Sequence, residues 1–341
     1  MRDVEILILG GGPAGATAAL NLSPSHRVVV VDARTEALER IGESLPSAAR
    51  RLLGDMGLLK SFLHEGHAPW YGNRAVWGGS IPIENDFLRD LNGHGWHLDR
   101  ARFETWLREI AAKRGATFLT PSRFEKVERI GSSWTISLNT GEELRARLLI
   151  DASGRGANLA RRLGAHILVD DHLTCRWLSG RATGPAGLTI VEAVEDGWWY
   201  TAPLPRGCRV LAFHTRPGRV GLGQPLLRRA AATLEVSRVL KEDNFVPQVG
   251  ERVVSAFSAA LSPCVGAGSD FLARFAERTF HRARGRGIGG PQSFRRWRCA
   301  PGICADGCRD SLAISETARP LLRIGNPLAG ISILAGTPFR S

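Results

Sequence analysis

Two short apolar runs frame the first helical segment of the chain, and their spacing predicts a β-α-β unit. Residues 6–9 are Ile-Leu-Ile-Leu and residues 28–31 are four valines, a pattern typical of strands buried on both faces. The alanine-rich segment Ala16–Leu22 lies between them and favours a helix. A strand, a crossover helix and a second strand are therefore expected within the first 31 residues.

The turn after the first strand carries the G-x-G-x-x-G pattern of a dinucleotide-binding loop. Gly10 permits a tight turn, Gly12 lets a pyrophosphate approach the backbone, and Gly15 lets the helix lie close to the strand. Pro13 and Ala14 complete the loop and open the helix, whose free N–H groups and dipole favour negative charge. We expect these five residues to bind the phosphates of a dinucleotide.

Asp32 directly follows the second strand, at the distance expected for the acid that binds a ribose hydroxyl. A 2′-phosphate would be repelled there, so the motif favours FAD or NAD over NADP. The alternative interpretation is a glycine-rich turn in some other β-α-β unit. The position of the acid makes that alternative the weaker one.

The rest of the chain alternates between helical and strand patterns. Helical spacing of apolar residues predicts helices over 47–56, after Arg100 and over 225–240. Residues 64–97 are rich in Gly, Pro and Trp, which predicts short strands and loops around a pocket. Strand patterns cover Ala116–Leu119, Glu125–Ile130, Trp134–Leu138, Leu144–Ile150, Leu188–Glu192, Trp198–Pro203 and Val210–His214. Beyond about Gly266 the pattern deteriorates, which predicts a disordered tail or a degenerate, frameshifted end.

Composition narrows the class of protein. The chain has 341 residues, of which 43% are apolar and 23% charged, as in a globular protein large enough for two interleaved subdomains. No apolar run is long enough to predict a membrane span. The first strand begins by Val4 and leaves no room for a signal peptide, so a cytoplasmic location is expected.

The net charge of +12 arises mainly in the C-terminal quarter, without a nucleic-acid-binding motif, so no nucleic-acid partner is expected. An anionic substrate, a partner surface or a damaged reading frame would each explain the excess. The spacing of the six cysteines matches no common zinc site, which predicts free thiols and no metal centre.

Several sequence blocks resemble one family of flavoproteins. They are Gly10–Gly15, Gly42–Pro46, Gly95–Arg100, Asp151–Gly154 and Gly197–Pro203. In these blocks the chain resembles FAD-dependent oxidoreductases of the group that includes p-hydroxybenzoate-hydroxylase-fold monooxygenases and flavin-dependent tryptophan halogenases. Through Gly66–Arg74 it most resembles flavoproteins that oxidise a tryptophan of a partner polypeptide in quinone-cofactor maturation.

This resemblance implies an α/β fold, α+β overall, in which a Rossmann-like FAD-binding domain is interleaved with an antiparallel β-sheet substrate domain. The expected FAD-binding domain comprises residues 1–60, 98–165 and 255–341, and the expected substrate domain comprises 61–97 and 166–254. FAD is the implied cofactor. NAD(P)H or an external flavin reductase would supply the electrons.

The resemblance also implies cofactor contacts beyond the glycine loop. Glu43 and Ser44 would border the flavin, and Arg100 resembles the family's FAD-contacting arginine. Ser44 has a second interpretation as the cap of the helix that begins near Pro46. Asp151 and Gly154 follow a central strand, where doubly wound sheets bind ligands.

Four aromatic or imidazole side chains are candidates for the substrate pocket. Trp198 and Tyr200 alternate along one strand and share a face, and Trp96 and His97 lie in another matching block. Ordinary core packing is the competing interpretation and is about equally favoured for the Trp198 block. The catalytic residues themselves stay unassigned.

The expected reaction is oxidation of an aromatic ring, in a small molecule or a partner's tryptophan, through a flavin C4a-hydroperoxide. Halogenases resemble one another in a Trp-x-Trp-x-Ile-Pro block and in a lysine some thirty residues after the Glu43 motif. Here Tyr200 and Ala202 interrupt the block, and Arg74 occupies the neighbourhood of the lysine. A guanidinium does not readily form a haloamine, so halogenation is the less favoured alternative.

Two further alternatives stay open. The family's Gly-Asp block in the C-terminal third is not evident, and Gly268-Ser269-Asp270 matches it poorly. A truncated or inactive flavoprotein relative is therefore possible. An enzyme of the geranylgeranyl-reductase type shares the fold and the first motif.

Overall fold

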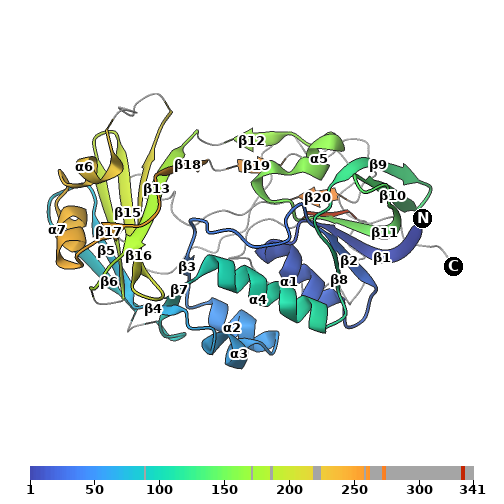
Figure 1. Cartoon of the computed structure of the whole chain (residues 1–341), viewed down its shortest axis with the longest axis horizontal. Helices are drawn as coiled ribbons and strands as arrows, with labels where there is room; N and C mark the ends of the chain where they lie inside the picture. Colours follow the sequence, from blue (N-terminus) through green and yellow to red (C-terminus); the bar gives the residue numbers. More distant parts are fainter. Residues whose placement is uncertain are drawn as a thin grey trace, which may run out of the picture.

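The computed structural model describes residues 1–87, 90–169, 172–184, 187–217, 224–256, 259–261, 271–273 and 332–334. Two large sheets stand side by side, with helices α1 and α4 beneath the sheet that contains β1 (Figure 1). The first sheet has the strand order β20-β21-β11-β1-β2-β8, and β9 and β10 extend it beside β11. Its strands are β1 (Arg2–Leu9), β2 (Val28–Val31), β8 (Thr117–Leu119), β9 (Phe124–Ile130), β10 (Ser133–Leu138), β11 (Glu143–Asp151), β20 (Phe271–Ala273) and β21 (Ser332–Leu334).

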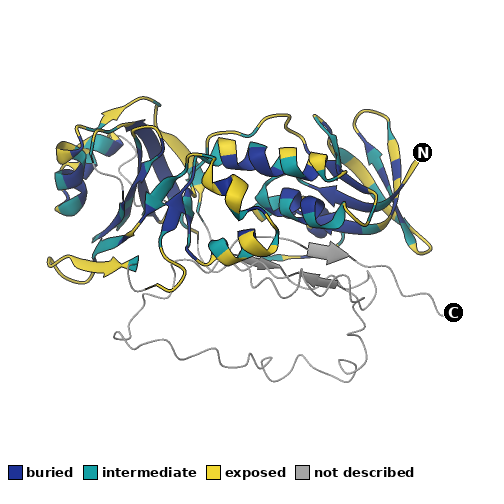
Figure 2. Ribbon diagram, turned by 90° about the horizontal axis from the view of Figure 1, so that it is seen from below, coloured by how far each residue is buried: buried dark blue, intermediate teal, exposed yellow. Residues whose placement is uncertain are grey.

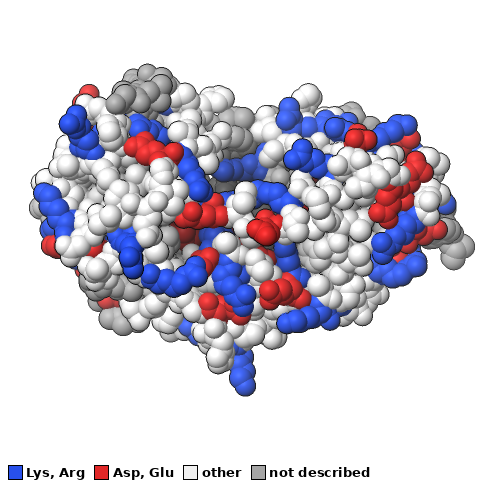
Figure 3. Space-filling model, in the orientation of Figure 1, with Lys and Arg blue, Asp and Glu red and all other residues white. Residues whose placement is uncertain are grey.

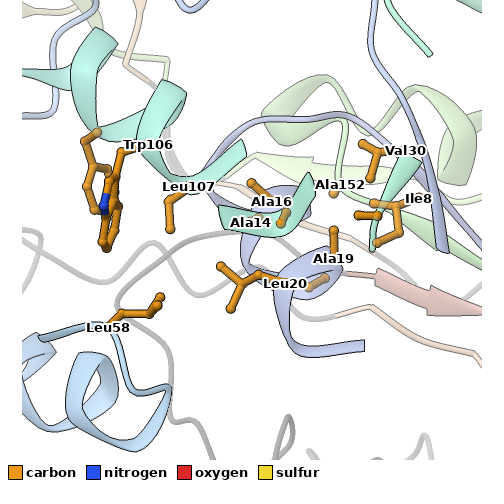
Figure 4. Close-up of a cluster of buried hydrophobic side chains, with 14 of the residues drawn as sticks. Ile8, Ala14, Ala16, Ala19, Leu20, Val30, Leu58, Trp106, Leu107 and Ala152 are labelled. Carbon is orange, nitrogen blue, oxygen red and sulfur yellow. The ribbon is translucent and has the colours of Figure 1, made fainter. Parts of the chain in front are cut away.

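The predicted β-α-β unit is present. Strand β1 pairs in parallel with β2 and β11, and β2 pairs in parallel with β8. Helix α1 (Pro13–Leu22) connects β1 to β2, and α4 (Arg100–Lys113) packs beside α1. Figure 4 shows the apolar layer that joins these helices to the strands, built from Ile8, Val30, Leu20 and Leu107 among others. The burial of such side chains contributes roughly 2 kcal/mol each.

The second sheet has the order β17-β13-β16-β15-β14-β5-β6, with β18 also paired to β13. Its pairing is antiparallel except between β14 and β5. The strands are β5 (Gly72–Val76), β6 (Ile83–Asp86), β13 (Thr174–Arg181), β14 (Leu188–Val194), β15 (Gly197–Leu204), β16 (Cys208–Thr215), β17 (Val246–Pro247) and β18 (Arg252–Ser255). Helices α6 (Leu226–Ala230) and α7 (Glu235–Glu242) cover one face of this sheet with a buried apolar cluster (Figures 1 and 2).

Smaller elements complete the described structure. A three-stranded sheet joins β3 (Ser44–Leu45), β7 (Gly95–His97) and β4 (Ala68–Trp70), and a two-stranded sheet pairs β12 (Ile167–Val169) with β19 (Ala259–Leu261). The short helices are α2 (Ala49–Asp55), α3 (Leu59–Leu63) and α5 (Asn158–Arg162). The three-stranded sheet combines β3 of the predicted FAD-binding domain with β4 and β7 of the predicted substrate domain. This pairing crosses the predicted boundary and does not define it, so the domain limits stay predictions.

Two expectations need correction. Residues 225–240 form two helices rather than one, because Glu192 accepts hydrogen bonds from the N–H groups of Leu234, Glu235 and Val236 and begins α7 anew. The C-terminal region is not wholly irregular, since β20 and β21 pair with each other and β21 pairs with β11. The other segments of that predicted tail, including Gly268-Ser269-Asp270, lie outside the described residues.

No helix in the described part of the chain is long and apolar enough to cross a membrane.

Candidate functional site

The glycine loop leaves free space at one of its three glycines and is tightly packed at the other two. A Cβ at Gly10, which has a φ of +106°, would lie 2.3 Å from the Ala152 carbonyl oxygen, and one at Gly15 would lie 1.8 Å from that of Gly10. A Cβ at Gly12 would meet no atom within 4 Å. Gly12 precedes Pro13 at the start of α1, and no side chain caps this end of the helix. The loop therefore offers open helix N–H groups to an anion.

Asp32 holds this loop in place at the carboxyl end of β2. Its carboxylate accepts the Gly11 N–H at 2.5 Å and the Arg34 N–H at 2.8 Å, and the side chain is buried. Arg108 of α4 lies 3.3 Å from the same carboxylate and donates from Nε to the Gly11 carbonyl at 2.7 Å. Arg108 carries no signal in the sequence, because a helical arginine among other charges is indistinguishable from a solvated one.

Asp151 serves the loop beside Gly10. Its buried carboxylate accepts the N–H and O–H of Ser153 at 2.9 and 2.6 Å and the Ala160 N–H at 2.9 Å. These bonds fix the turn after β11 and the start of α5. Gly154 has a φ of +80° and open space at its Cβ position. The geometry thus gives Asp151 a positioning role and leaves Gly154 room for a ligand.

Arg100 begins α4 and faces the segment that carries Glu43. It donates to the Gly42 carbonyl at 2.6 Å and pairs with Glu104 at 2.6 Å, while its Nε is buried without a hydrogen-bond partner in the described structure. Glu43 is 3% exposed, and burial raises its pKa to about 7, although the N–H groups of Gly42 and Glu43 and the charge of Arg100 act in the opposite direction. Glu43 is therefore poised to exchange a proton near neutral pH.

Ser44 connects this segment to the second sheet. Its hydroxyl lies 2.9 Å from the hydroxyl of Tyr200 in β15. Burial, and secondarily the nearby Glu43 carboxylate, raise the pKa of Tyr200, so the phenol stays protonated. The face of β15 that carries Tyr200 therefore looks toward Glu43 and Ser44, opposite α6 and α7.

Trp198 lies on the same face of the second sheet. Its indole stacks on His214 of β16 with 3.7 Å between ring centroids and an angle of 3° between the planes, and Trp77 lies 6.5 Å away. Cys175 of β13 is the register partner of His214, and burial raises its pKa to about 12. Cys175 and Cys208 are free thiols; the other four cysteines lie outside the described residues.

Trp96 and His97 occupy a different environment. Trp96 is 3% exposed and packs edge-on against Phe62, and His97 is fully buried beside Thr189. Burial lowers the pKa of His97 to about 3, so its ring is neutral. Neither side chain is open to a ligand in this structure, whereas Trp198 and Tyr200 are partly exposed.

Arg74, which occupies the neighbourhood of the halogenase lysine in the sequence, does not face this site. Arg74 of β5 pairs with Glu84 and, at 3.2 Å, with Glu235 of α7, which places it on the helix-covered face. The four lysines of this chain all lie exposed on the surface: Lys60, Lys113, Lys126 and Lys241. Cationic and acidic side chains are interspersed on the face of the molecule shown in Figure 3.

A separate surface pocket of about 260 Å³ lies at the turn between β15 and β16. Ala68, Pro203, Leu204, Arg206 and Cys208 contribute to its lining. None of the residues predicted to bind the cofactor or the substrate lines it.

The residues present fit FAD. The open space at Gly12 and the uncapped start of α1 suit a diphosphate. The buried Nε of Arg100, which has no hydrogen-bond partner among the described residues, suits a polar group of the cofactor. Oδ1 of Asp32 accepts only the Arg34 N–H among the described residues and keeps a lone pair for a ribose hydroxyl, whereas Oδ2 accepts from both Gly11 and Arg108.

Comparison with known proteins agrees with this geometry. The family model described as FAD binding domain matches residues 3–230, and the chain belongs to this family. FAD is the cofactor of the family.

A putative FAD-dependent oxidoreductase of Marinomonas mediterranea, LodB, is 30% identical over 224 residues, which are 63% of this chain and 61% of that protein. The chain thus spans about three-fifths of this relative's length. Among solved structures, the myxobacterial chondrochloren halogenase CndH superposes with a TM-score of 0.68 at 22% identity, covering 76% of this chain and 65% of that one. The peptidyl tryptophan dihydroxylase QhpG superposes with a TM-score of 0.59 at 24% identity, covering 78% and 59%. Both likenesses concern the fold.

Proposed function

We propose that this chain is an FAD-dependent, monooxygenase-like enzyme that oxidises an aromatic ring, either in a small molecule or in the tryptophan of a partner polypeptide. The observation that carries the proposal is the continuous connection from the glycine loop to an aromatic face. Arg108 contacts Gly11 and Arg100 contacts Gly42, and these two arginines are about 12 Å apart along α4. An extended dinucleotide would therefore run along α4 toward Glu43.

The second half of the connection leads to the substrate side. Ser44 adjoins Glu43 and bonds Tyr200, whose strand neighbour on the same face is Trp198. Bound flavin would supply oxygen activation at this point. The chain's own groups would then orient an electron-rich ring against Trp198, exclude water by the burial of the Glu43 segment, and hold a proton on the Glu43 carboxyl near neutral pH.

Halogenation is the second candidate, and the fold likeness to a halogenase favours it. The side chains of this chain weigh against it. The mechanism implied by the halogenase resemblance needs a lysine near the flavin, whereas all four lysines are exposed on surface elements and Arg74 faces α7. We therefore favour oxygenation, with NAD(P)H or a separate flavin reductase as the electron source.

The test is product analysis with the purified chain. FAD-loaded protein, a flavin reductase and NAD(P)H are mixed with tryptophan-containing peptides in isotopically labelled oxygen, with chloride and bromide present, and the products are identified by mass spectrometry. Labelled oxygen in the indole is the expected result, and a halogenated indole would establish the alternative. Trp198→Ala should reduce product without loss of FAD, whereas Arg74→Gln, on the opposite face, should leave product formation intact. Protein that fails to bind FAD would indicate the inactive relative.

A further inference from the structure

The surface pocket at the turn between β15 and β16 has a buried carboxylate in its wall. Asp243, the residue that follows α7, lines this pocket together with Gly184. Its side chain is 6% exposed. Because buried polar atoms in folded proteins are nearly always hydrogen-bonded, the partners of this carboxylate indicate what the pocket can bind.

One oxygen of Asp243 is bonded by the protein, and the other is not. Arg209 of β16 donates to Oδ2 from Nε at 2.7 Å, and its Nη2 lies 2.6 Å from the same oxygen. Oδ1 accepts no hydrogen bond from the described residues. It lies on the side of Gly184, where a Cβ would be 1.6 Å from it. Oδ1 therefore keeps its lone pairs for a donor in the pocket.

The carboxylate is held in place by the protein itself. The Asp243 carbonyl accepts the Thr183 N–H at 2.7 Å, which fixes its backbone. Arg209 is 3% exposed in its pair with Asp243 and also donates to the Thr201 hydroxyl at 3.2 Å. Because the acceptor is already oriented, little ordering would be required when a ligand binds.

The rest of the lining contributes mainly apolar surface. Ala68, Ala182 and Leu204 line the pocket, as do Pro203 and Pro205. The two proline nitrogens carry no hydrogen and cannot donate. A ligand that satisfies Oδ1 must therefore bring its own donor on an otherwise apolar body.

The charges around the pocket favour a neutral donor over a cation. Arg209 neutralises Asp243, and the guanidinium of Arg206, which also lines the pocket, pairs with Asp99. An ammonium group beside Oδ1 would lie close to the buried Arg209 charge, and the low dielectric would strengthen their repulsion. A neutral N–H or O–H gains a bond to a charged acceptor without this repulsion.

We propose that this pocket binds a small neutral molecule with an apolar body and one N–H or O–H donor. The body packs against Ala68, Ala182 and Leu204, and the donor bonds Oδ1 of Asp243. The volume of about 260 Å³ is slightly below that of pockets for drug-sized ligands and suits a bicyclic ring. Leu204 ends β15 four residues after Tyr200, roughly 13 Å along the strand, so this site is distinct from the proposed substrate face.

Indole and N-methylindole test the donor, since they share a ring system and only indole has an N–H. Cys208 lines the pocket and is a free thiol, so a bound molecule should slow its alkylation by iodoacetamide. Peptide mass spectrometry measures this rate at Cys208 in the full-length chain. Half-maximal protection by indole should need about tenfold less compound than protection by N-methylindole, the value of a hydrogen bond to a charged acceptor. No protection by indole, or equal protection by both, overturns the proposal.

Three variants locate the bound indole. Asp243→Asn can place an amide NH₂ at the position of Oδ1 and should remove the advantage of indole over N-methylindole. Ala68→Leu fills the pocket without changing the Arg209 pair and should abolish protection, so it decides the matter even if Asp243→Asn does not fold. Trp198→Ala should leave protection unchanged. Protection that persists in Ala68→Leu, or is lost in Trp198→Ala, would refute the proposal. The experiment needs neither flavin nor turnover, so its result is independent of the proposed function.

Discussion

Arg108 and Asp32 form a buried ion pair that closes a ring around Gly11. The guanidinium lies 3.3 Å from the carboxylate, with 12% and 7% of the two side chains exposed. Arg108 also donates to the Gly11 carbonyl, and the Gly11 N–H donates to Asp32. The glycine loop is therefore held in its binding conformation by the protein alone, so little ordering would be required when a dinucleotide binds.

Replacement of Arg108 should loosen this loop. In Arg108→Met the buried Asp32 charge loses its partner and the Gly11 carbonyl loses a donor, so we expect a loss of about 2 kcal/mol in unfolding free energy and at least tenfold weaker FAD binding. Urea unfolding and FAD titration measure the two effects. Arg102→Met is the matched control, because Arg102 is 47% exposed in its pair with Glu65 and should cost less than 1 kcal/mol. Equal behaviour of the two variants would show that the Asp32 pair is dispensable.

The two glycines at the start of α1 should respond to alanine in opposite ways. Gly12 has a φ of −71° and no atom within 4 Å of its Cβ position, so Gly12→Ala should fold with unchanged stability yet weaken FAD binding about tenfold or more by obstructing the diphosphate. Gly15→Ala would place Cβ 1.8 Å from the Gly10 carbonyl oxygen and should destabilise the fold by about 1–3 kcal/mol. Thermal unfolding and flavin fluorescence of both variants separate the effects. A destabilised Gly12→Ala would mean that the apparent space is filled.

Local pattern sufficed for the strands of the first sheet from β1 to β11, for the glycine loop and for Asp32, but not for β20 and β21, which lie in the predicted tail. The four valines of β2 and the alternation in β10 and β11 are strong signals that need no tertiary context. Strand β13 was missed because it contains Arg176, a residue atypical of a buried strand, which is 6% exposed and paired with Glu251. Such an arginine is compatible with a core only through distant partners, here the Glu251 carboxylate 75 residues away and the Gln224 carbonyl 48 residues away.

The candidate site was predictable only in part, for the same reason. Asp32 and the glycines follow from spacing along one segment, whereas Arg108 lies 97 positions after Gly11 in the sequence and contacts it only in the folded chain. The shared face of Trp198 and Tyr200 follows from strand alternation. The orientation of this face toward Ser44 depends on how the three-stranded sheet packs against the second large sheet, for which the sequence carries no local signal.

Glu192 should be a stability determinant of the second sheet and its helices. Its carboxylate accepts three backbone N–H groups at the start of α7, at 2.6, 2.9 and 2.9 Å. Glu192→Ala would leave these donors unpaired and should cost about 2–4 kcal/mol in unfolding free energy. Glu192→Gln, which keeps one acceptor oxygen, should cost less. Glu195→Ala, at an exposed position of the same hairpin, is the control and should change stability by less than about 0.5 kcal/mol.

Ionisation of Glu43 should lower stability as the pH rises. Burial raises its pKa from 4.5 to about 7, so between these values the folded state binds a proton that the unfolded state has released. Stability from this group is full below pH 4.5 and is lost as the pH rises to about 7. His67 and His97 act in the opposite sense, since burial lowers their pKa values to about 4 and about 3 and stability falls as the pH drops below 6.5.

Comparison with Glu43→Gln isolates the Glu43 contribution, because both histidines are retained in the variant. Glutamine keeps an acceptor for the Gly42 N–H and cannot ionise, so the variant should equal the wild type near pH 4.5 and be more stable above pH 7 by on the order of 3 kcal/mol. Urea unfolding at pH 5, 6, 7 and 8 measures the difference, which should grow through this interval and then level off. A difference that stays constant with pH would show that Glu43 is ionised throughout the range, and the protonated carboxyl assigned to it beside Ser44 would then be wrong.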